Sequence, residues 1–341
     1  MNVNARKYRL HLEYPFGIAS YTRNHHDIVL LQIEHKGLVA YGEASMAKYL
    51  GETPESVMDF IATIDVRQIN PEKYSIADIH AYLNSLAPGN TAAKAALDIA
   101  LHDLQGKLMH KPCYAMYSSK PEDMPLTSLT VGIDQPEIIR EKVRKASAFK
   151  AIKVKLGSPY DKDIVAAVRQ VTDVPLYIDA NQGWDDKHLA LDMIYWLAEQ
   201  GAVFVEQPMD KEDFDANGWI SQNSPIPIIA DEAMQRLQDV ERLADYYSGI
   251  NVKLMKCAGI YEGYQVIQKA RSLGLKLMIG CMTETSCAIA AAAVLAPFCD
   301  WADLDGPWLI TNNPFEAPVL EDGRIQLNKS YGLGLNLTGQ L

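Results

Sequence analysis

The chain has 341 residues, 48% of them hydrophobic and 22% charged, which is an ordinary composition for a packed soluble protein. Its formal net charge of −11 argues against nucleic acid or an anionic membrane as the main partner. No apolar run is long enough to cross a bilayer, and the first residues lack the apolar core of a signal peptide. We therefore expect a cytoplasmic protein.

The first third of the chain predicts a small α+β domain. Residues 5–12 alternate in polarity as a strand does, and residues 28–44 read as two apolar strands around a turn at 35–37. A helix-like stretch follows at 54–64, and the alanine-rich segment 91–108 has strong helical propensity. Strands followed by helices favour a capping domain over part of a barrel.

From about residue 126 the pattern changes to alternating strands and helices. Eight short apolar runs are predicted as strands, at residues 127–132, 151–155, 175–179, 202–206, 227–231, 250–254, 276–280 and 301–304. Eight strands at this period fit a (β/α) barrel better than a doubly wound sheet. No full helix is predicted after the eighth strand. We predict a capping domain at 1–115, a (β/α)7β barrel at 116–310, and a tail at 311–341 that returns to the cap.

Acidic residues stand at the ends of three successive predicted strands. They are Asp179, Glu206 and Asp231, and the carboxyl ends of parallel strands meet on one face of the fold. A single such residue is often only a helix N-cap, but three carboxylates without His or Cys suit Mg²⁺ with open positions for substrate oxygens. Asn181 and Glu232, beside two of them, are candidates for orienting the ligands and binding substrate, although Asn181 alternatively caps the next helix.

Lysines flank the same predicted face. Lys153 and Lys155 are two residues apart on one strand, so their side chains point to the same side. Placing two ammonium groups at the polar mouth of the barrel costs less free energy than burying them in the apolar helix layer, so we expect them at the mouth. Crowding beside a metal is expected to lower their pKa values, which makes a usable general base. Lys253 lies four predicted strands away, on the opposite side of the ring. Its competitor Lys256 cannot share that strand face and is expected at the rim. Two bases on opposite sides of one carbon suggest removal and return of a proton α to a carboxylate.

The motifs KVK, DAN, EQP, ADE, VKLMK and DLDGP occur in this order, together with AALDIALHDLQGK and GCMTETS. This set resembles the muconate-lactonizing subgroup of the enolase superfamily over almost the whole chain. The resemblance implies a modified TIM barrel, (β/α)7β, with an α+β capping domain. It also implies one Mg²⁺ per subunit on the three strand-end carboxylates, acid/base roles for Lys155 and Lys253, and Lys153 as the electrostatic partner of Lys155.

Two further segments resemble the dipeptide epimerases of this subgroup. In those enzymes an aspartate pair, matched here by Asp303 and Asp305, binds the α-ammonium group of the substrate. The segment PFGIASYTRN resembles the mobile cap loop of L-Ala-D/L-Glu epimerases, in which an arginine near Arg23 pairs with the glutamate side-chain carboxylate. The mandelate-racemase branch instead takes a histidine from the seventh strand, which here ends in Ile-Gly-Cys at 279–281.

The resemblance therefore implies a Mg-dependent isomerase that epimerises the C-terminal residue of the small molecule L-Ala-D/L-Glu, in recycling of murein peptides and as a homo-oligomer. Three alternatives stay open. The first is a dipeptide epimerase of other side-chain specificity. The second is an o-succinylbenzoate synthase or N-acylamino acid racemase, whose substrates carry no free α-ammonium and do not require Asp303 and Asp305. The third, a binding protein on the same scaffold, is disfavoured by the intact lysines and carboxylates.

Overall fold

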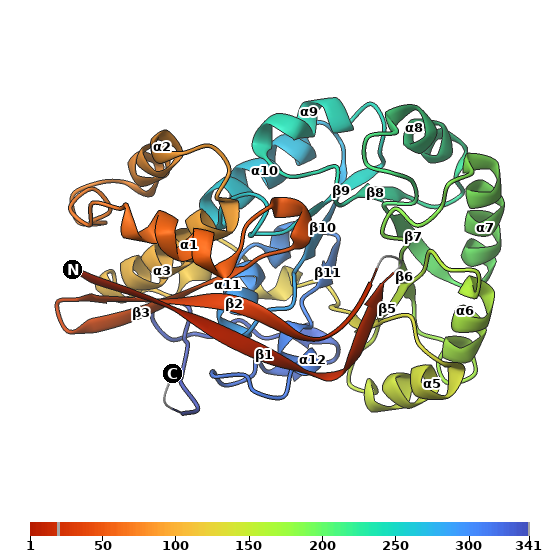
Figure 1. Ribbon diagram of the computed structural model, residues 1–341, viewed down its shortest axis with the longest axis horizontal. Coiled ribbons are helices and arrows are strands. Elements are labelled where there is room, and N and C mark those ends of the chain that lie inside the picture. Colours follow the sequence, from red (N-terminus) through yellow and green to blue (C-terminus); the bar gives the residue numbers. More distant parts are fainter. Residues whose placement is uncertain (19–20, 340–341) are drawn as a thin grey trace.

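The computed structural model describes residues 1–18 and 21–339. Figure 1 shows an N-terminal part, in red and orange, lying beside a barrel of strands surrounded by helices. In the described residues, no helix combines the length and the apolar character that crossing a membrane requires. The two parts meet at the mouth of the barrel, where the candidate site lies.

The N-terminal part contains a three-stranded antiparallel sheet in the order β1-β2-β3. Its strands are β1 (Asn2–Ile18), β2 (Tyr21–His35) and β3 (Leu38–Ser45). The predicted strand and the predicted hairpin are both confirmed, and the hairpin turns through Lys36 and Gly37, which both have positive φ as a type I′ turn requires.

The segment predicted to be a cap loop is instead the end of two paired strands. After a register shift, Phe16 of β1 pairs with Arg23 of β2, and Gly17 pairs with Thr22. Residues 19 and 20 of this segment lie outside the described residues. The Gly17 carbonyl accepts a hydrogen bond (3.0 Å) from the N–H of Ile133, so this hairpin extends from the cap to the barrel (Figure 1).

Helices cover one side of this sheet. The elements are η1 (Lys48–Leu50), α1 (Pro54–Ala62), α2 (Ile76–Leu86), α3 (Thr91–Leu108), α4 (Cys113–Met116) and η2 (Pro121–Asp123). The alanine-rich α3 is buried along most of its length and packs closely on β3. A Cβ atom at Gly42 would lie 1.9 Å from the Ala96 carbonyl oxygen. The small residues on both elements are therefore what allows this close approach.

The barrel sheet has eight strands in sequence order. They are β4 (Leu129–Val131), β5 (Ile152–Lys155), β6 (Leu176–Asp179), β7 (Ala202–Glu206), β8 (Ile228–Ala230), β9 (Gly249–Val252), β10 (Lys276–Gly280) and β11 (Trp301–Asp303). A parallel bridge between Thr127 and Ala302 joins the first strand to the last and closes the barrel. All eight predicted strands are confirmed. The tilted, closely packed rings of Tyr177, Phe204 and Trp301 fill the interior, so the site lies above a packed core.

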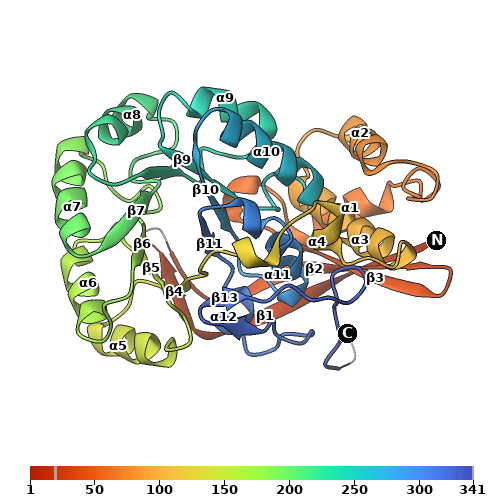
Figure 2. The same ribbon diagram turned by 180° about the vertical axis from the view of Figure 1, so that it is seen from behind.

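Helices surround the barrel, as Figure 2 shows from behind. They are α5 (Pro136–Lys145), α6 (Asp161–Arg169), α7 (Lys187–Glu199), α8 (Phe214–Asn223), η3 (Leu237–Asp239), α9 (Val240–Leu243), α10 (Ile260–Ser272), α11 (Ser286–Ala293), η4 (Ala296–Phe298) and α12 (Gly306–Leu309). In the described residues, the one helix after β11 is the short α12, in agreement with the predicted (β/α)7β architecture.

The C-terminal segment contacts the cap. It carries a small hairpin of β12 (Leu320–Glu321) and β13 (Arg324–Ile325). The Phe315 ring packs edge-on against Tyr41 at 5.3 Å, and the Leu333 N–H donates to Asp103 of α3 at 2.8 Å. The domain limits at residues 115 and 310 remain our proposal.

Buried polar contacts join the cap to the barrel. Glu43 of β3 is fully buried and accepts hydrogen bonds from the N–H and the hydroxyl of Thr285, which caps the N-terminus of α11. Burial raises the pKa of Glu43 to about 7. These contacts fix the end of β3 against the loop after β10, which forms one wall of the candidate site.

Candidate active site

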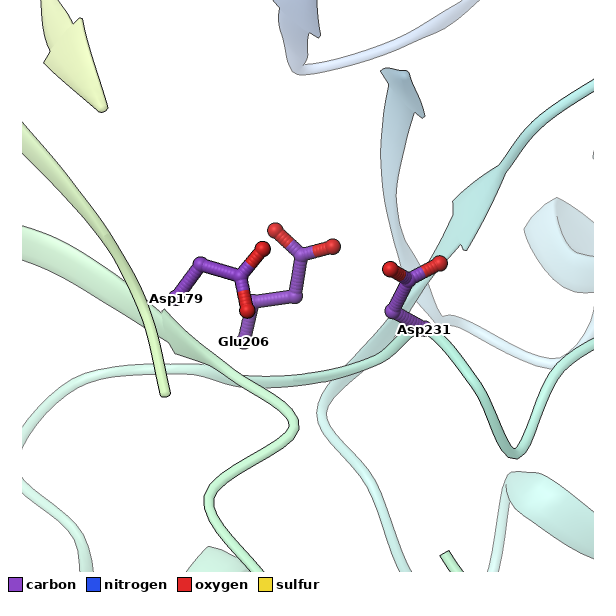
Figure 3. A group of neighbouring side chains, drawn as sticks. All are labelled: Asp179, Glu206 and Asp231. Atoms are coloured by element: carbon purple, nitrogen blue, oxygen red, sulfur yellow. The ribbon is translucent and has the colours of Figure 1, made fainter. Parts of the chain in front are cut away.

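The three predicted metal ligands converge at the carboxyl ends of neighbouring strands. Asp179 and Glu206 are the last residues of β6 and β7, and Asp231 follows β8 directly. One oxygen from each carboxylate lies within 4.8 Å of the others, and all three side chains are buried. Figure 3 shows the three carboxylates around one shared space.

The crowding of buried carboxylates in this cluster fits a divalent cation. Burial, together with the charges of Asp179 and Asp231, raises the pKa of Glu206 to about 8. Glu206 Oε2 lies 2.7 Å from Lys153 Nζ but accepts no well-aligned hydrogen bond from any described residue. Buried carboxylate oxygens crowded in this way are the donors that Mg²⁺ prefers. The residues present therefore fit the predicted ion.

Both lysines of β5 point into the barrel mouth, as predicted. Lys155 Nζ donates to Asp179 Oδ2 at 2.6 Å. Lys153 lies deeper and is fully buried, with its Nζ 2.7 Å from Glu206 Oε2, 3.0 Å from Asp303 Oδ2 and 3.1 Å from Asp179 Oδ2. Lys153 thus carries the positive charge at the centre of the cluster, while Lys155 is placed nearer the open end.

Lys253 and Lys256 occupy different positions around Asp231. Lys253, just after β9, donates to Asp231 Oδ2 at 2.6 Å. Lys256 is 1% exposed and donates to Asp231 Oδ1 and to the backbone carbonyls of Asp231 and Asn251. The expected rim position of Lys256 is therefore wrong. The chain turns after β9, with the Lys256 N–H donating to the Lys253 carbonyl, and this turn brings Lys256 behind Asp231.

The pKa values of Lys153 and Lys253 are both raised, although the sequence predicted that crowding beside a metal would lower the pKa of Lys153. Burial is the largest single influence on Lys253 and lowers its pKa, but the charges of Asp231, Tyr49 and Glu206 together outweigh burial, and the net shift is well upward. Burial also lowers the pKa of Lys153, but the charges of Asp303, Glu206 and Asp179 raise it, and the net shift is again upward. Three of these carboxylates are also the candidate metal ligands, so a bound cation would compete with the lysines for the same negative charge.

A cavity of about 380 Å³ opens above the cluster, between the barrel mouth and the cap. Its volume is within the usual range for small-molecule sites. The barrel lines it with Lys153, Lys155, Asn181, Asp231, Glu232, Lys253, Asp303 and Asp305, all predicted from the sequence. The cap contributes Arg23, which was predicted, and also Phe16, His26, Lys48 and Tyr49, which were not.

The predicted aspartate pair lines the cavity, and its two members come from different elements. Asp303 ends β11 and accepts hydrogen bonds from Ser128 (2.7 Å) and Thr130 (3.2 Å), in addition to its ion pair with Lys153. Asp305 lies beyond the strand, at the start of α12, and accepts from the Thr130 N–H at 2.6 Å. Burial and the Asp303 charge raise the pKa of Asp305 to about 7. A cationic group of a substrate beside Asp305 would stabilise the charged form of this buried carboxylate.

Three further predicted residues lie on the cavity wall. Arg23 of β2 contacts His26 Nδ1 at 2.8 Å and donates to Thr283 Oγ1 at 2.7 Å. Asn181 donates to Glu232 Oε1 at 3.2 Å, so these two side chains hold each other beside the carboxylate cluster. The following helix α7 is capped by Asp186. The alternative role of Asn181 as that cap is therefore wrong.

Comparison with known proteins agrees with this architecture. Residues 138–341 match the family described as enolase C-terminal domain-like, and residues 1–116 match the N-terminal domain of mandelate racemase / muconate lactonizing enzymes. The chain belongs to the enolase superfamily.

Several members of this superfamily are similar over nearly the full chain. The L-Ala-D/L-Glu epimerase of Bacteroides thetaiotaomicron is 48% identical over 96% of this chain and 86% of its own length. An L-Ala-D/L-amino acid epimerase of Pedosphaera parvula is 37% identical over 92% of both chains. The crystal structure of a dipeptide epimerase from Enterococcus faecalis, in complex with Mg and L-Leu-L-Tyr, aligns with a TM-score of 0.88 at 32% identity over 98% of both chains. The chain is thus an isomerase of the enolase superfamily.

Proposed function

We propose that this superfamily member is a Mg-dependent dipeptide epimerase that inverts the α-carbon of the C-terminal residue of L-Ala-D/L-Glu. The observation that supports it best is the placement of Lys155 and Lys253. The two lysines come from β5 and from the end of β9, four strands apart in a closed sheet of eight. They therefore enter the cavity from opposite sides, as inversion by proton transfer requires.

Different side chains of the cavity carry out the proton transfers and stabilise the negative charge of the intermediate. One of the two lysines removes the α-proton, the bonding electrons move into the substrate carboxylate, and the other lysine donates a proton to the opposite face. The buried ammonium of Lys153 adds positive charge beneath the developing enediolate. A bound Mg²⁺ would supply further positive charge for the same carboxylate, held by Asp179, Glu206 and Asp231.

Two charged groups of the cavity wall support a dipeptide with an acidic second residue. Asp305, supported by Asp303, offers a carboxylate for the free α-ammonium of the first residue. Arg23 offers a planar guanidinium that pairs well with a side-chain carboxylate. The name of the Bacteroides relative favours L-Ala-D/L-Glu, whereas the Pedosphaera relative is named for a broader set of second residues.

Proton exchange across a peptide library tests this proposal. Dipeptides and their N-acetylated counterparts are incubated with the enzyme and Mg²⁺ in D₂O, and loss of each α-proton signal is followed by NMR. We expect exchange and epimerisation at the second residue of L-Ala-L-Glu, with little activity on N-acetyl compounds. Equal activity on the N-acetylated series would instead support an N-acylamino acid racemase. Exchange with no member of either series would overturn the proposal.

The variant Asp305→Asn tests the ammonium site. It removes the negative charge but keeps an oxygen that can accept from the Thr130 N–H. We expect KM for L-Ala-L-Glu to rise about tenfold or more, because a hydrogen bond to a charged group contributes ~1.5–3 kcal/mol. Asp303→Asn should reduce kcat as well, since Asp303 pairs with Lys153. Asp192→Asn, on the exposed side of α7, is the matched control. An unchanged KM in Asp305→Asn would remove Asp305 from this role.

The variant Arg23→Met tests the specificity for the side chain of the second substrate residue. It should lower kcat/KM for L-Ala-L-Glu by about tenfold or more relative to L-Ala-L-Leu, because only the former offers a carboxylate to pair with the guanidinium. Arg67→Met, an exposed arginine of the cap, is the control. An equal loss for both substrates would leave a dipeptide epimerase without a preference for glutamate.

We further propose that the enzyme acts in the cytoplasm as a homo-oligomer and serves recycling of murein peptides. The substrate supports the pathway, since L-Ala-D-Glu is the kind of dipeptide that cell-wall turnover would supply. Light scattering during size-exclusion chromatography would test the oligomeric state, and a single-subunit mass would contradict it.

A further inference from the structure

Two neutral groups hold the guanidinium of Arg23 at the cavity wall. One terminal nitrogen lies 2.8 Å from His26 Nδ1, and the other donates to Thr283 Oγ1 at 2.7 Å. Contacts on both terminal nitrogens fix the plane of a guanidinium as well as its position. Because an imidazole without charge and a hydroxyl do not offset a positive charge, neither partner neutralises Arg23.

The hydrogen-bond chain behind His26 determines its tautomer. The Ser45 hydroxyl donates to the backbone carbonyl of Thr283 at 2.8 Å, and it also lies 2.9 Å from His26 Nε2. A carbonyl can only accept, so the single Ser45 proton is committed there and Ser45 must accept from Nε2–H. His26 Nδ1 is then unprotonated and accepts from Arg23. Burial and the Arg23 charge lower the pKa of His26 to about 3, which agrees with a neutral ring.

This chain also crosses the junction between the two domains. His26 and Ser45 belong to β2 and to the end of β3, whereas Thr283 lies in the loop after β10. All three are buried. Arg23 and Ser45 both bind Thr283, through its side chain and its carbonyl respectively. The orientation of the guanidinium therefore depends on how the capping domain packs against the barrel.

We infer that His26 is a positioning residue for substrate specificity: through its neutral Nδ1 it aims Arg23 at an anionic side chain of the second substrate residue. The inference rests on the proposed function and deepens it. A carboxylate in place of this imidazole would pair with Arg23 and compete with the substrate, whereas a neutral acceptor orients the guanidinium without itself offsetting the positive charge. His26 and Thr283 carry this role together, and Ser45 fixes the tautomer.

The test compares two isosteric substrates, L-Ala-L-Glu and L-Ala-L-Gln, in His26→Leu and His26→Asn. Leu removes the acceptor, while Asn places its Oδ1 close to the position of the imidazole Nδ1. We expect His26→Leu to lower the Glu/Gln ratio of kcat/KM by about tenfold. The change should lie mainly in KM for L-Ala-L-Glu, and His26→Asn should restore most of the ratio. His25→Leu is the matched control, because His25 is the exposed neighbour on the same strand.

Thr283→Val provides a second, independent variant. It removes the hydroxyl that accepts from Arg23 but keeps the carbonyl that accepts from Ser45, and it should lower the same ratio even if His26→Leu does not fold. If His26→Leu and Thr283→Val lower kcat/KM for both substrates by the same factor, so that the Glu/Gln ratio is unchanged, the positioning role is overturned. The proposed epimerase activity would still stand. A wild-type enzyme that epimerises neither dipeptide would instead contradict the proposed function itself.

Discussion

Replacing either Lys155 or Lys253 with methionine should lower the rate of L-Ala-L-Glu epimerisation by about 10²–10⁴-fold, the usual contribution of a general acid or base. Each lysine can serve only one face of the α-carbon, so neither can substitute for the other in a complete inversion. Methionine keeps most of the side-chain length and removes the proton-transferring group. The rate can be followed by polarimetry or by NMR of the two diastereomers.

Lys276→Met is the matched control for both variants. Lys276 begins β10 at the opposite end of the barrel and is exposed, so its replacement should leave the rate unchanged. Thermal denaturation should confirm that Lys155→Met and Lys253→Met are folded, since each removes one of the ion pairs of a buried aspartate. A folded Lys253→Met with the wild-type rate would show that the proton donor on that side had been wrongly assigned.

Glu206→Gln should lower activity by about 10³-fold, equivalent to ~4 kcal/mol of transition-state stabilisation, because it removes one anionic ligand from the proposed Mg²⁺ site. The amide oxygen can still accept from Asn251, which donates to Glu206 Oε1 at 2.7 Å, so the local structure should persist. Asp231 is less suitable for this test, because its carboxylate also holds Lys253 and Lys256.

A second readout separates metal binding from catalysis. Mg²⁺ should raise the melting temperature of the wild-type protein, since a ligand that binds only the folded state stabilises it, and this increase should be much smaller in Glu206→Gln. Glu199→Gln at the exposed end of α7 should behave like the wild type. Full activity after treatment with a chelator would rule out the metal assignment.

The barrel and its site were predictable because both follow from periodicity. Each strand is a short apolar run, and the polar residue that ends it marks the carboxyl end, where parallel strands converge. Asp179, Glu206 and Asp231 could therefore be grouped without a structure. The even spacing of strands also placed Lys155 and Lys253 on opposite sides of the ring.

The remaining features depend on contacts that strand periodicity does not encode. Lys256 is buried behind Asp231 because the chain turns back after β9, and Asp305 leaves the strand face because β11 ends at Asp303. His26 gains its contact with Arg23 only where the cap meets the loop after β10. The extension of the β1–β2 hairpin was missed because the Pro15-Phe16-Gly17 segment reads as a loop, and a register shift accommodates it in the sheet.

The most direct test of two opposed bases is the pattern of deuterium exchange in Lys155→Met and Lys253→Met. Each variant is incubated in D₂O with L-Ala-L-Glu and, separately, with L-Ala-D-Glu, and exchange of the α-proton of the glutamate residue is measured by NMR. We predict a crossed pattern: each variant exchanges only the epimer whose α-proton faces its remaining lysine, and the two variants act on different epimers. Equal loss of exchange for both epimers in both variants, or retention of the same epimer by both, would contradict a mechanism with one lysine on each face.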